Sequence, residues 1–302
     1  MQEIMEVSDG KNHGLMSHRG FMLIKGIHDP DEVDMIRNLE IKESDVLVVT
    51  YPKSGTIWMQ QILLLLEAKG DLTAINKHST FSNGELVPWI EVKGYIEAFI
   101  KAQPPRMRVS HLPFSLLPSA LSQKKGKVIY VARNPKDVLV SYFHFHKVAN
   151  MLETPTDFDN FFEKFMRGDV FGSSWFEHIK MWYLHKDDLN MLFLTYEEMI
   201  KDLHSAVERI ALFLGSEVTD EQLADVVKHS TFNNMKKIPQ ANYERVPSHL
   251  LSHQKGMFMR KGTIGDWKNH FTVAQNERFD DTFRREMEGI PLDFIWDIKD
   301  IV

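Results

Sequence analysis

The 302-residue chain lacks three features that would place it in a special class. It has no cysteine, which excludes disulfide bonds and fits a reducing compartment. Its longest apolar run, residues 62–66, is far too short to cross a bilayer. Residues 1–20 are polar and carry no apolar signal core. We therefore expect a soluble, cytoplasmic protein that does not contact membranes.

An excess of positive charge is also missing. The chain has 36 Lys and Arg against 42 Asp and Glu, a net charge of −6. This balance argues against a general nucleic-acid binder, so an anionic ligand must be held by a local cluster of positive groups. No Pro/Gly/Ser-rich linker and no internal repeat interrupts the chain. We expect one domain over residues 1–302, with residues 1–20 as a flexible N-terminal segment.

The most informative stretch is a predicted strand, turn and helix near residue 50. Residues 46–49 are apolar and rich in valine, as is typical of a strand buried on both faces. Pro52 ends that strand, and Gly55 permits a tight turn. Residues 57–66 are apolar on nearly every side, which predicts a buried helix.

This strand–turn–helix unit predicts an anion site. The first N–H groups of a helix have no partner within the helix, and the helix dipole adds positive charge there. Lys53 adds a full charge, and Ser54 and Thr56 add hydroxyl donors. The Walker pattern is absent, because Lys53 precedes Gly55 instead of following it. A small anionic group such as a single 5′-phosphate therefore fits better than a triphosphate, although an ordinary capped turn would have the same sequence.

A second unit of the same kind follows. Residues 128–132 form a strong strand pattern, and Asn134 and Pro135 are a favourable N-cap and first helical residue. The helix is expected to reach about residue 147. Its turn carries Arg133 and its second turn carries Ser141, which predicts a second anion site.

The rest of the pattern predicts the fold. Further strands are expected at residues 21–27, 107–110 and 189–196, further helices at 29–38, 175–185, 203–214, 219–229 and 273–287, and loops at 71–85 and 239–256. Alternating strands and helices predict a single α/β domain with a central parallel sheet flanked by helices. Four polar residues follow predicted strands, and the carboxyl ends of parallel strands form one ligand site: Lys53, His111, Arg133 and Tyr196.

Three motifs together resemble those of the cytosolic sulfotransferase family. Tyr-Pro-Lys-Ser-Gly-Thr-Ile-Trp at 51–58 resembles its P-loop-like phosphosulfate loop, and Arg-Asn-Pro-Lys-Asp at 133–137 with Ser141 resembles its 3′-phosphate unit. Arg-Lys-Gly-Thr-Ile-Gly-Asp-Trp-Lys at 260–268 resembles its C-terminal signature. The similarity covers about residues 21–287.

The resemblance implies a cofactor, 3′-phosphoadenosine 5′-phosphosulfate (PAPS), and no metal. By position, the 5′-phosphate would be held by Lys53, Ser54, Gly55, Thr56 and Ile57. The 3′-phosphate would be held by Arg133, Ser141, Arg260, Lys261 and Gly262. The adenine would lie between Trp58 and Phe232, with Tyr196, Ser230 and Met259 around it. Phe258 would be a further cofactor-binding residue. PAPS has two separate anionic ends, which agrees with the two anion sites found from the residues alone.

The resemblance also implies transfer of a sulfuryl group to a small hydrophobic acceptor such as a steroid, phenol or arylamine. His111 would be the general base, Lys53 would stabilise the leaving group, and Ser141 would hold Lys53 aside until the acceptor arrives. The acceptor pocket would comprise Phe21, Phe81, Trp89, His111, Phe145 and Tyr243, with residues 239–256 as a lid. Lys268, Thr272, Val273 and Glu277 resemble a short motif that would form a weak homodimer.

Two departures from the family pattern leave alternatives open. Val109 stands where many members have lysine, and strand alternation directs the neighbouring Arg108 to the opposite face. Ile57 stands where many have threonine, which removes one hydroxyl. A catalytically silent nucleotide-binding module is therefore one alternative. Another transferase or kinase that uses a nucleoside phosphate is a second, although the missing Walker pattern argues against it.

Overall fold

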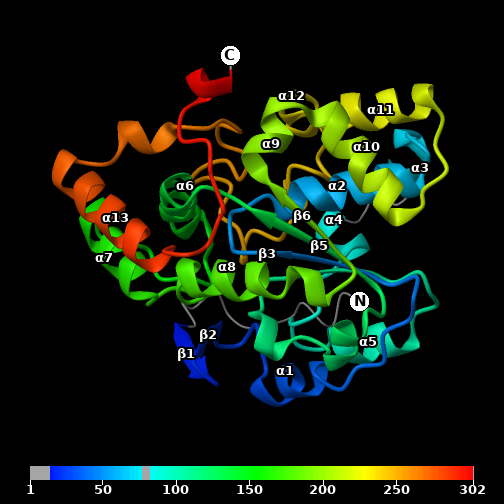
Figure 1. The fold of residues 1–302 in the computed structure, drawn as a ribbon, viewed down its shortest axis with the longest axis horizontal. Helices are drawn as coiled ribbons and strands as arrows, with labels where there is room; N and C mark the ends of the chain where they lie inside the picture. The colour runs from blue at the N-terminus through cyan, green and yellow to red at the C-terminus, as the bar shows by residue number, and fades with distance from the viewer. Residues whose placement is uncertain (1–13, 77–81, 302) are drawn as a thin grey trace.

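A sheet of four parallel strands lies at the centre of the computed structural model, which describes residues 14–76 and 82–301 (Figure 1). The strand order is β4-β3-β5-β6. Their bounds are β3 (Val46–Thr50), β4 (Met107–Ser110), β5 (Lys127–Ala132) and β6 (Met191–Thr195). The register pairs Val46 with Met107 on one side and with Lys127 on the other. The expected parallel sheet is confirmed.

Helices cover both faces of this sheet, and alternate residues of β3 show why. Val46 and Val48 pack into one apolar cluster, whereas Leu47 and Val49 pack into another. Every residue of β3 is buried, which matches its continuous apolar sequence. The Val48 face is covered by α2 (Thr56–Glu67), α9 (Tyr196–Lys201), α10 (Leu203–Leu214) and α11 (Asp220–Ser230).

The opposite face carries a larger, strongly aromatic cluster. It includes side chains from α1 (Pro30–Ile36), α5 (Tyr95–Lys101), α6 (Pro135–Val148), α7 (Phe158–Arg167), α8 (Trp175–Leu184) and α13 (Val273–Glu286). Phe162 of α7 meets Phe279 of α13, and Arg278 pairs with Glu163 beside them. These two helices flank one side of the molecule in Figure 1.

Several short elements were not predicted. Residues 71–85 were expected to be loop, but they contain α3 (Leu72–Asn76) and α4 (Asn83–Leu86). A capping box between Ser82 and Glu85 begins α4, and the Asp71 carboxylate accepts the Thr73 N–H of α3. Both are cap signals that operate over three or four residues, below the length at which apolar periodicity can be read.

Helices α5 and α7 were missed as well, although α7 has clear signals. Asp157 caps its first turn by accepting the Asn160 N–H, and Gly168 ends it at φ +76. Phe161, Phe162 and Phe165 lie at helical spacing between these caps and are buried. The short α12 (Phe232–Met235) begins the stretch that leads into the expected lid.

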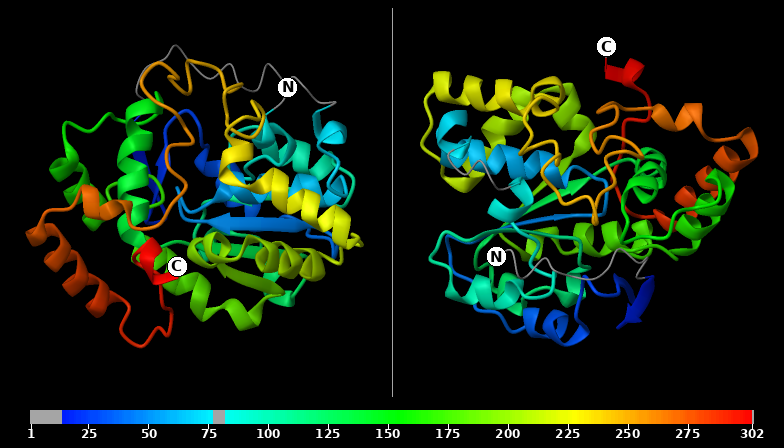
Figure 2. Two further views of the ribbon diagram at one scale, coloured as in Figure 1. Left: turned by 90° about the horizontal axis from the view of Figure 1, so that it is seen from above. Right: turned by 180° about the vertical axis from the view of Figure 1, so that it is seen from behind.

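The expected lid, residues 239–256, contains no helix or extended strand in the structure. It crosses from α12 towards the end of α6 (Figure 2), where Leu251 forms an isolated bridge with Ala149. The remaining described elements are short 3-10 turns at Phe114–Leu116, Ser119–Gln123, Lys186–Asp188, Asp266–Asn269 and Ile298–Ile301.

At the N-terminus, part of the segment expected to be flexible is a strand. β1 (Leu15–His18) pairs antiparallel with β2 (Phe21–Ile24) in a separate two-stranded sheet. Residues 1–13 lie outside the described part. Among the described residues, no helix is both long and apolar enough to cross a membrane.

Candidate functional site

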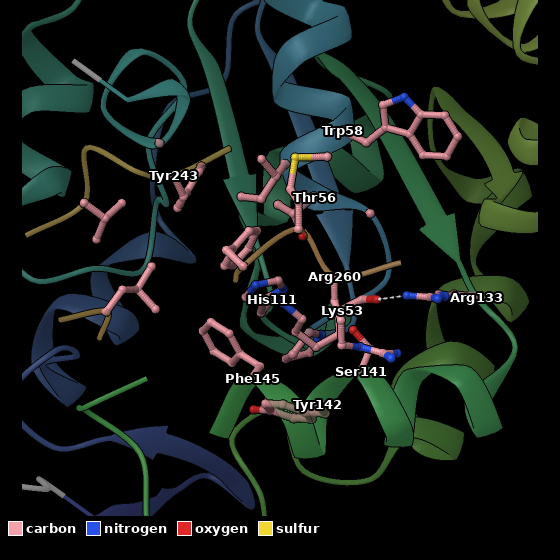
Figure 3. A pocket seen from close by; sticks show the side chains of 18 of the residues that line it. Lys53, Thr56, Trp58, His111, Arg133, Ser141, Tyr142, Phe145, Tyr243 and Arg260 are labelled. Atoms are coloured by element: carbon pink, nitrogen blue, oxygen red, sulfur yellow. Dashed lines mark hydrogen bonds between the residues drawn. The ribbon is translucent and has the colours of Figure 1, made fainter. Parts of the chain in front are cut away.

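One cavity of about 560 Å³ opens at the carboxyl ends of the parallel strands. Lys53, His111, Arg133 and Tyr196, each of which follows a different strand, all line it. Figure 3 shows His111, Lys53 and Phe145 close together, with Arg133 and Arg260 to one side. This volume lies within the usual range for small-molecule sites.

The turn between β3 and α2 brings backbone to the cavity. Gly55 adopts φ +113, and a Cβ there would lie 3.2 Å from the Tyr196 ring, so a side chain would be both strained and crowded. Lys53 also adopts a left-handed conformation, at φ +71. The turn therefore ends at the N-terminus of α2, where free N–H groups favour an anion.

Most of the predicted site residues line this one cavity. They are Lys53, Gly55, Thr56, Ile57, Trp58, Trp89, His111, Arg133, Ser141, Phe145, Tyr196, Ser230, Phe232, Tyr243, Phe258, Met259, Arg260, Lys261 and Gly262.

Three predicted residues are not among them. Ser54 is fully buried behind the turn, where its N–H donates to the Tyr51 carbonyl. Phe21 points into the core and packs edge-on against Phe171, because its position on β2 directs it to the buried side. It does not line the cavity, so its placement in the acceptor pocket is corrected. Phe81 lies outside the described residues.

The Lys53 ammonium is held between two aromatic rings. Its Nζ lies 4.2 Å from the centroids of both Phe145 and Phe258. Burial, together with the charges of Arg133 and Arg260, lowers the pKa of Lys53 to about 7. No hydrogen bond joins Lys53 to Ser141 within the described ranges. An anion bound nearby would favour the charged form of this lysine.

His111 is oriented by its backbone surroundings. Its Nδ1 lies 2.8 Å from the Thr50 carbonyl, to which it donates, so Nε2 is left as an acceptor. The His111 N–H donates to the Glu91 carboxylate at 2.7 Å. Burial lowers the pKa of His111 to about 4, with the Lys53 charge acting in the same direction. At neutral pH His111 is therefore an uncharged imidazole that can accept a proton.

Arg133 contacts the turn between β3 and α2. One guanidinium nitrogen donates to the Lys53 carbonyl at 3.0 Å, the contact drawn dashed in Figure 3. The guanidinium also stacks on the Tyr196 ring at 4.2 Å. Its Nε is buried without a protein partner among the described residues, as is the Ser230 hydroxyl. These two polar groups are available to a ligand.

Asp266 organises the basic loop after Met259. Its carboxylate forms ion pairs with both Arg260 and Lys261, which hold the pKa of Asp266 well below its usual range. Gly262 follows at φ +62, and a Cβ there would lie 2.2 Å from the Phe232 ring. Glycine is therefore required where this loop approaches Phe232.

The residues before His111 differ from the family pattern, and the structure shows where they point. Val109 is fully buried and packs with the apolar side chains of the Val48 face. The Arg108 guanidinium lies 5.3 Å from the Phe99 ring centroid, and Arg108 does not line the cavity. Neither residue supplies a second cation beside Lys53.

Among the residues that sequence reasoning missed, His28, Glu91, Phe171 and Asp266 matter most for the chemistry of this site. His28 and Asp266 line the cavity, and Phe171 joins the His28 and His111 rings. Glu91 is 1% exposed, and its burial raises its pKa to about 7. Of these, only Asp266 lies within a motif used in the sequence analysis, residues 260–268. Glu91 directly follows the apolar stretch 86–90, a context that gives no signal for a buried carboxylate.

Comparison with known proteins shows the family of this chain. A family model described as the sulfotransferase domain matches residues 43–291. The rabbit amine sulfotransferase is 44% identical, with 97% of each chain covered. Human sulfotransferase 2B1 is 40% identical over 98% of this chain and 80% of that protein.

Solved structures show the same fold. Mouse sulfotransferase SULT7A1 complexed with PAP is 29% identical, has a TM-score of 0.74, and covers 92% of this chain and 96% of its own. A retinol dehydratase solved with androsterone and inactive cofactor PAP has a TM-score of 0.78 at 24% identity and covers 97% of this chain and 95% of its own. The chain belongs to the sulfotransferase family, the class of transferases that use PAPS as the sulfate donor.

Proposed function

We propose that this chain transfers the sulfuryl group of PAPS to a hydroxyl, or to an uncharged amine, of a small hydrophobic acceptor. The observation that carries the proposal is the shape of the cavity. A basic part lined by Arg133, Arg260 and Lys261 joins an apolar part, and Lys53 and His111 line the same cavity.

The residues present fit the cofactor. The buried Nε of Arg133 and the Ser230 hydroxyl lack partners among the described residues, so binding a polar ligand would satisfy them. The turn at residues 53–57 would hold the 5′-phosphate through backbone N–H groups. The 3′-phosphate would be held by Arg133, Ser141, Arg260, Lys261 and Gly262. When bound, PAPS supplies an activated sulfuryl group.

His111 and Lys53 would then perform different tasks. His111 accepts the acceptor's hydroxyl proton at Nε2, because Nδ1 is already committed to the Thr50 carbonyl. Lys53 places positive charge where the leaving oxygen gains negative charge. In the structure its Nζ lies between the rings of Phe145 and Phe258. Ser141, which lines the same cavity, would hold Lys53 aside until the acceptor arrives.

The apolar part of the cavity defines the acceptor class. Its lining includes Trp89, Phe145, Leu152, Phe171 and Tyr243. A flat or bulky apolar molecule fits such a wall. The names of the relatives point the same way, since one is an amine sulfotransferase and one solved structure contains androsterone.

The test is transfer of labelled sulfate from PAPS to a panel of a simple phenol, a hydroxysteroid, a bile alcohol and an arylamine. Transfer to any of them establishes the reaction, and the pattern identifies the acceptor class. Tight binding of 3′,5′-adenosine bisphosphate without transfer would favour a silent nucleotide-binding module. ATP turnover without PAPS would favour another nucleoside-phosphate-dependent enzyme.

We also propose a weak homodimer through the stretch Lys268, Thr272, Val273 and Glu277. All four are exposed, and Val273 is 76% exposed at the first turn of α13. So short a stretch implies an interface below the roughly 1,200–2,000 Å² of a standard complex. We expect Val273→Glu to weaken dimerisation at least about tenfold, because it would bury a charge in place of an apolar side chain at the interface. Sedimentation of wild type and variant at micromolar concentration measures this, and a monomeric wild type contradicts it.

A further inference from the structure

A second imidazole lines the cavity that contains His111. His28 lies on the turn between β2 and α1 and is 5% exposed. Its Nδ1 lies 3.1 Å from the Ile24 nitrogen and 3.3 Å from the Ile24 carbonyl oxygen. Because that carbonyl already accepts the backbone N–H groups of Ile27 and His28, we assign Nδ1 as the acceptor of the Ile24 N–H, which places the ring hydrogen of the neutral form on Nε2. Nε2 has no protein partner among the described residues. The side chain therefore offers one unsatisfied donor in a cavity-lining, nearly buried position.

His28 lies close to the proposed reacting centre. Its ring packs on Phe171 with centroids 5.0 Å apart and an interplanar angle of 31°. His111 contacts the same Phe171 edge-on, at 5.8 Å. The two imidazoles are therefore neighbours across one aromatic ring. An acceptor whose hydroxyl meets His111 has other atoms within reach of His28.

The charged residues that line the cavity indicate what His28 would bind. Lys53 and Lys93 line the cavity, and burial lowers the pKa of His28 to about 4, so His28 is neutral. Among the described lining residues the one carboxylate is Asp266, which is already paired with Arg260 and Lys261. An ammonium on the acceptor would find no counter-charge, whereas an uncharged oxygen would find a donor.

We propose that His28 is a second recognition point for the acceptor, its Nε2–H donating a hydrogen bond to an oxygen other than the one that is sulfated. The preferred acceptors are then uncharged apolar molecules with two oxygen functions, such as hydroxy ketones or diols. This inference rests on the proposed function, because it uses the same acceptor cavity. It adds a specificity-determining residue that does not take part in proton transfer.

The test is a binding measurement on the complex with 3′,5′-adenosine bisphosphate, so it does not depend on turnover. Two acceptor pairs differ only in the second oxygen: androsterone against androstan-3α-ol, and 2,6-dihydroxynaphthalene against 2-naphthol. We expect the wild type to bind the dioxygenated member of at least one pair roughly tenfold more tightly than its partner. Equal affinities within both pairs would overturn the proposal.

Two substitutions separate recognition from structure. In His28→Asn the amide oxygen can still accept the Ile24 N–H, but the donor towards the cavity is lost, so the affinity ratio should fall to about one. His28→Gln places an amide N–H near the Nε2 position and should keep part of the ratio. His204→Asn, an exposed site that does not line the cavity, is the matched control and should keep all of it.

The outcomes keep this inference and the proposed function apart. A ratio that survives in His28→Asn shows that His28 only supports Ile24 and Phe171, and it overturns the inference. A wild-type ratio that is lost in His28→Asn, in a protein that transfers no sulfate to any acceptor, supports His28 and overturns the proposed transfer.

Discussion

Replacing His111 with alanine lowers the turnover of sulfate transfer by about 10²–10⁴-fold, the usual contribution of a positioned general base. Its Nε2 is the ring nitrogen free to take the acceptor's proton, since Nδ1 donates to the Thr50 carbonyl. Turnover is measured under saturating PAPS and acceptor. We expect nearly unchanged affinity for 3′,5′-adenosine bisphosphate, because the proposed nucleotide contacts come from other residues. A variant with near-normal turnover would remove His111 from the mechanism.

The pH profile tests the same assignment in the unmodified protein. A general base works only in its neutral form, so kcat/KM falls as pH drops through its pKa. Burial lowers the pKa of His111 to about 4, below the ordinary value of 6.5. We therefore expect kcat/KM to stay level between about pH 5.5 and 6.5, where an ordinary histidine would lose activity. A fall in kcat/KM centred near pH 6.5 would contradict a buried environment for His111.

The strand ends explain why so much of the site could be predicted from the sequence. The side chains of Lys53, His111, Arg133 and Tyr196 meet because each follows a buried strand of one parallel sheet. A run of apolar residues reveals such strands, and a parallel sheet brings their carboxyl ends together. Order along the chain was enough to predict a common cavity without any side-chain coordinates.

The residues that were missed depend on contacts that no local pattern encodes. Glu91 reaches the His111 N–H from a turn 20 residues earlier, and His28 meets Phe171 from across the fold. Phe21 is the opposite case: it was predicted to line the pocket but does not, because an aromatic residue beside a pocket can face the core. In each case the direction of one side chain decides whether the residue belongs to the site. The order of the strands does not determine that direction for a residue in a turn or in a separate hairpin.

Changing Lys53 to methionine should lower kcat by about 10²–10³-fold, the effect of removing one preorganised stabilising group. Methionine keeps the apolar stem and packs well against aromatic rings, so the contact with Phe145 and Phe258 should survive while the charge is lost. Lys53→Arg is the matched control. It restores a charge, but its planar guanidinium has a different shape, so only part of the rate should return.

The protonation of Lys53 can also be tested without measuring turnover. Its pKa is lowered to about 7 by burial and by Arg133 and Arg260, so at pH 8 most of the free protein carries it neutral. A bound bisphosphate brings negative charge and raises that pKa, so binding should take up close to one proton at pH 8. Calorimetry in buffers of different ionisation enthalpy measures this uptake. Proton uptake that persists in Lys53→Met would assign the uptake to another group. Loss of the uptake in that variant would show that binding of the bisphosphate protonates Lys53.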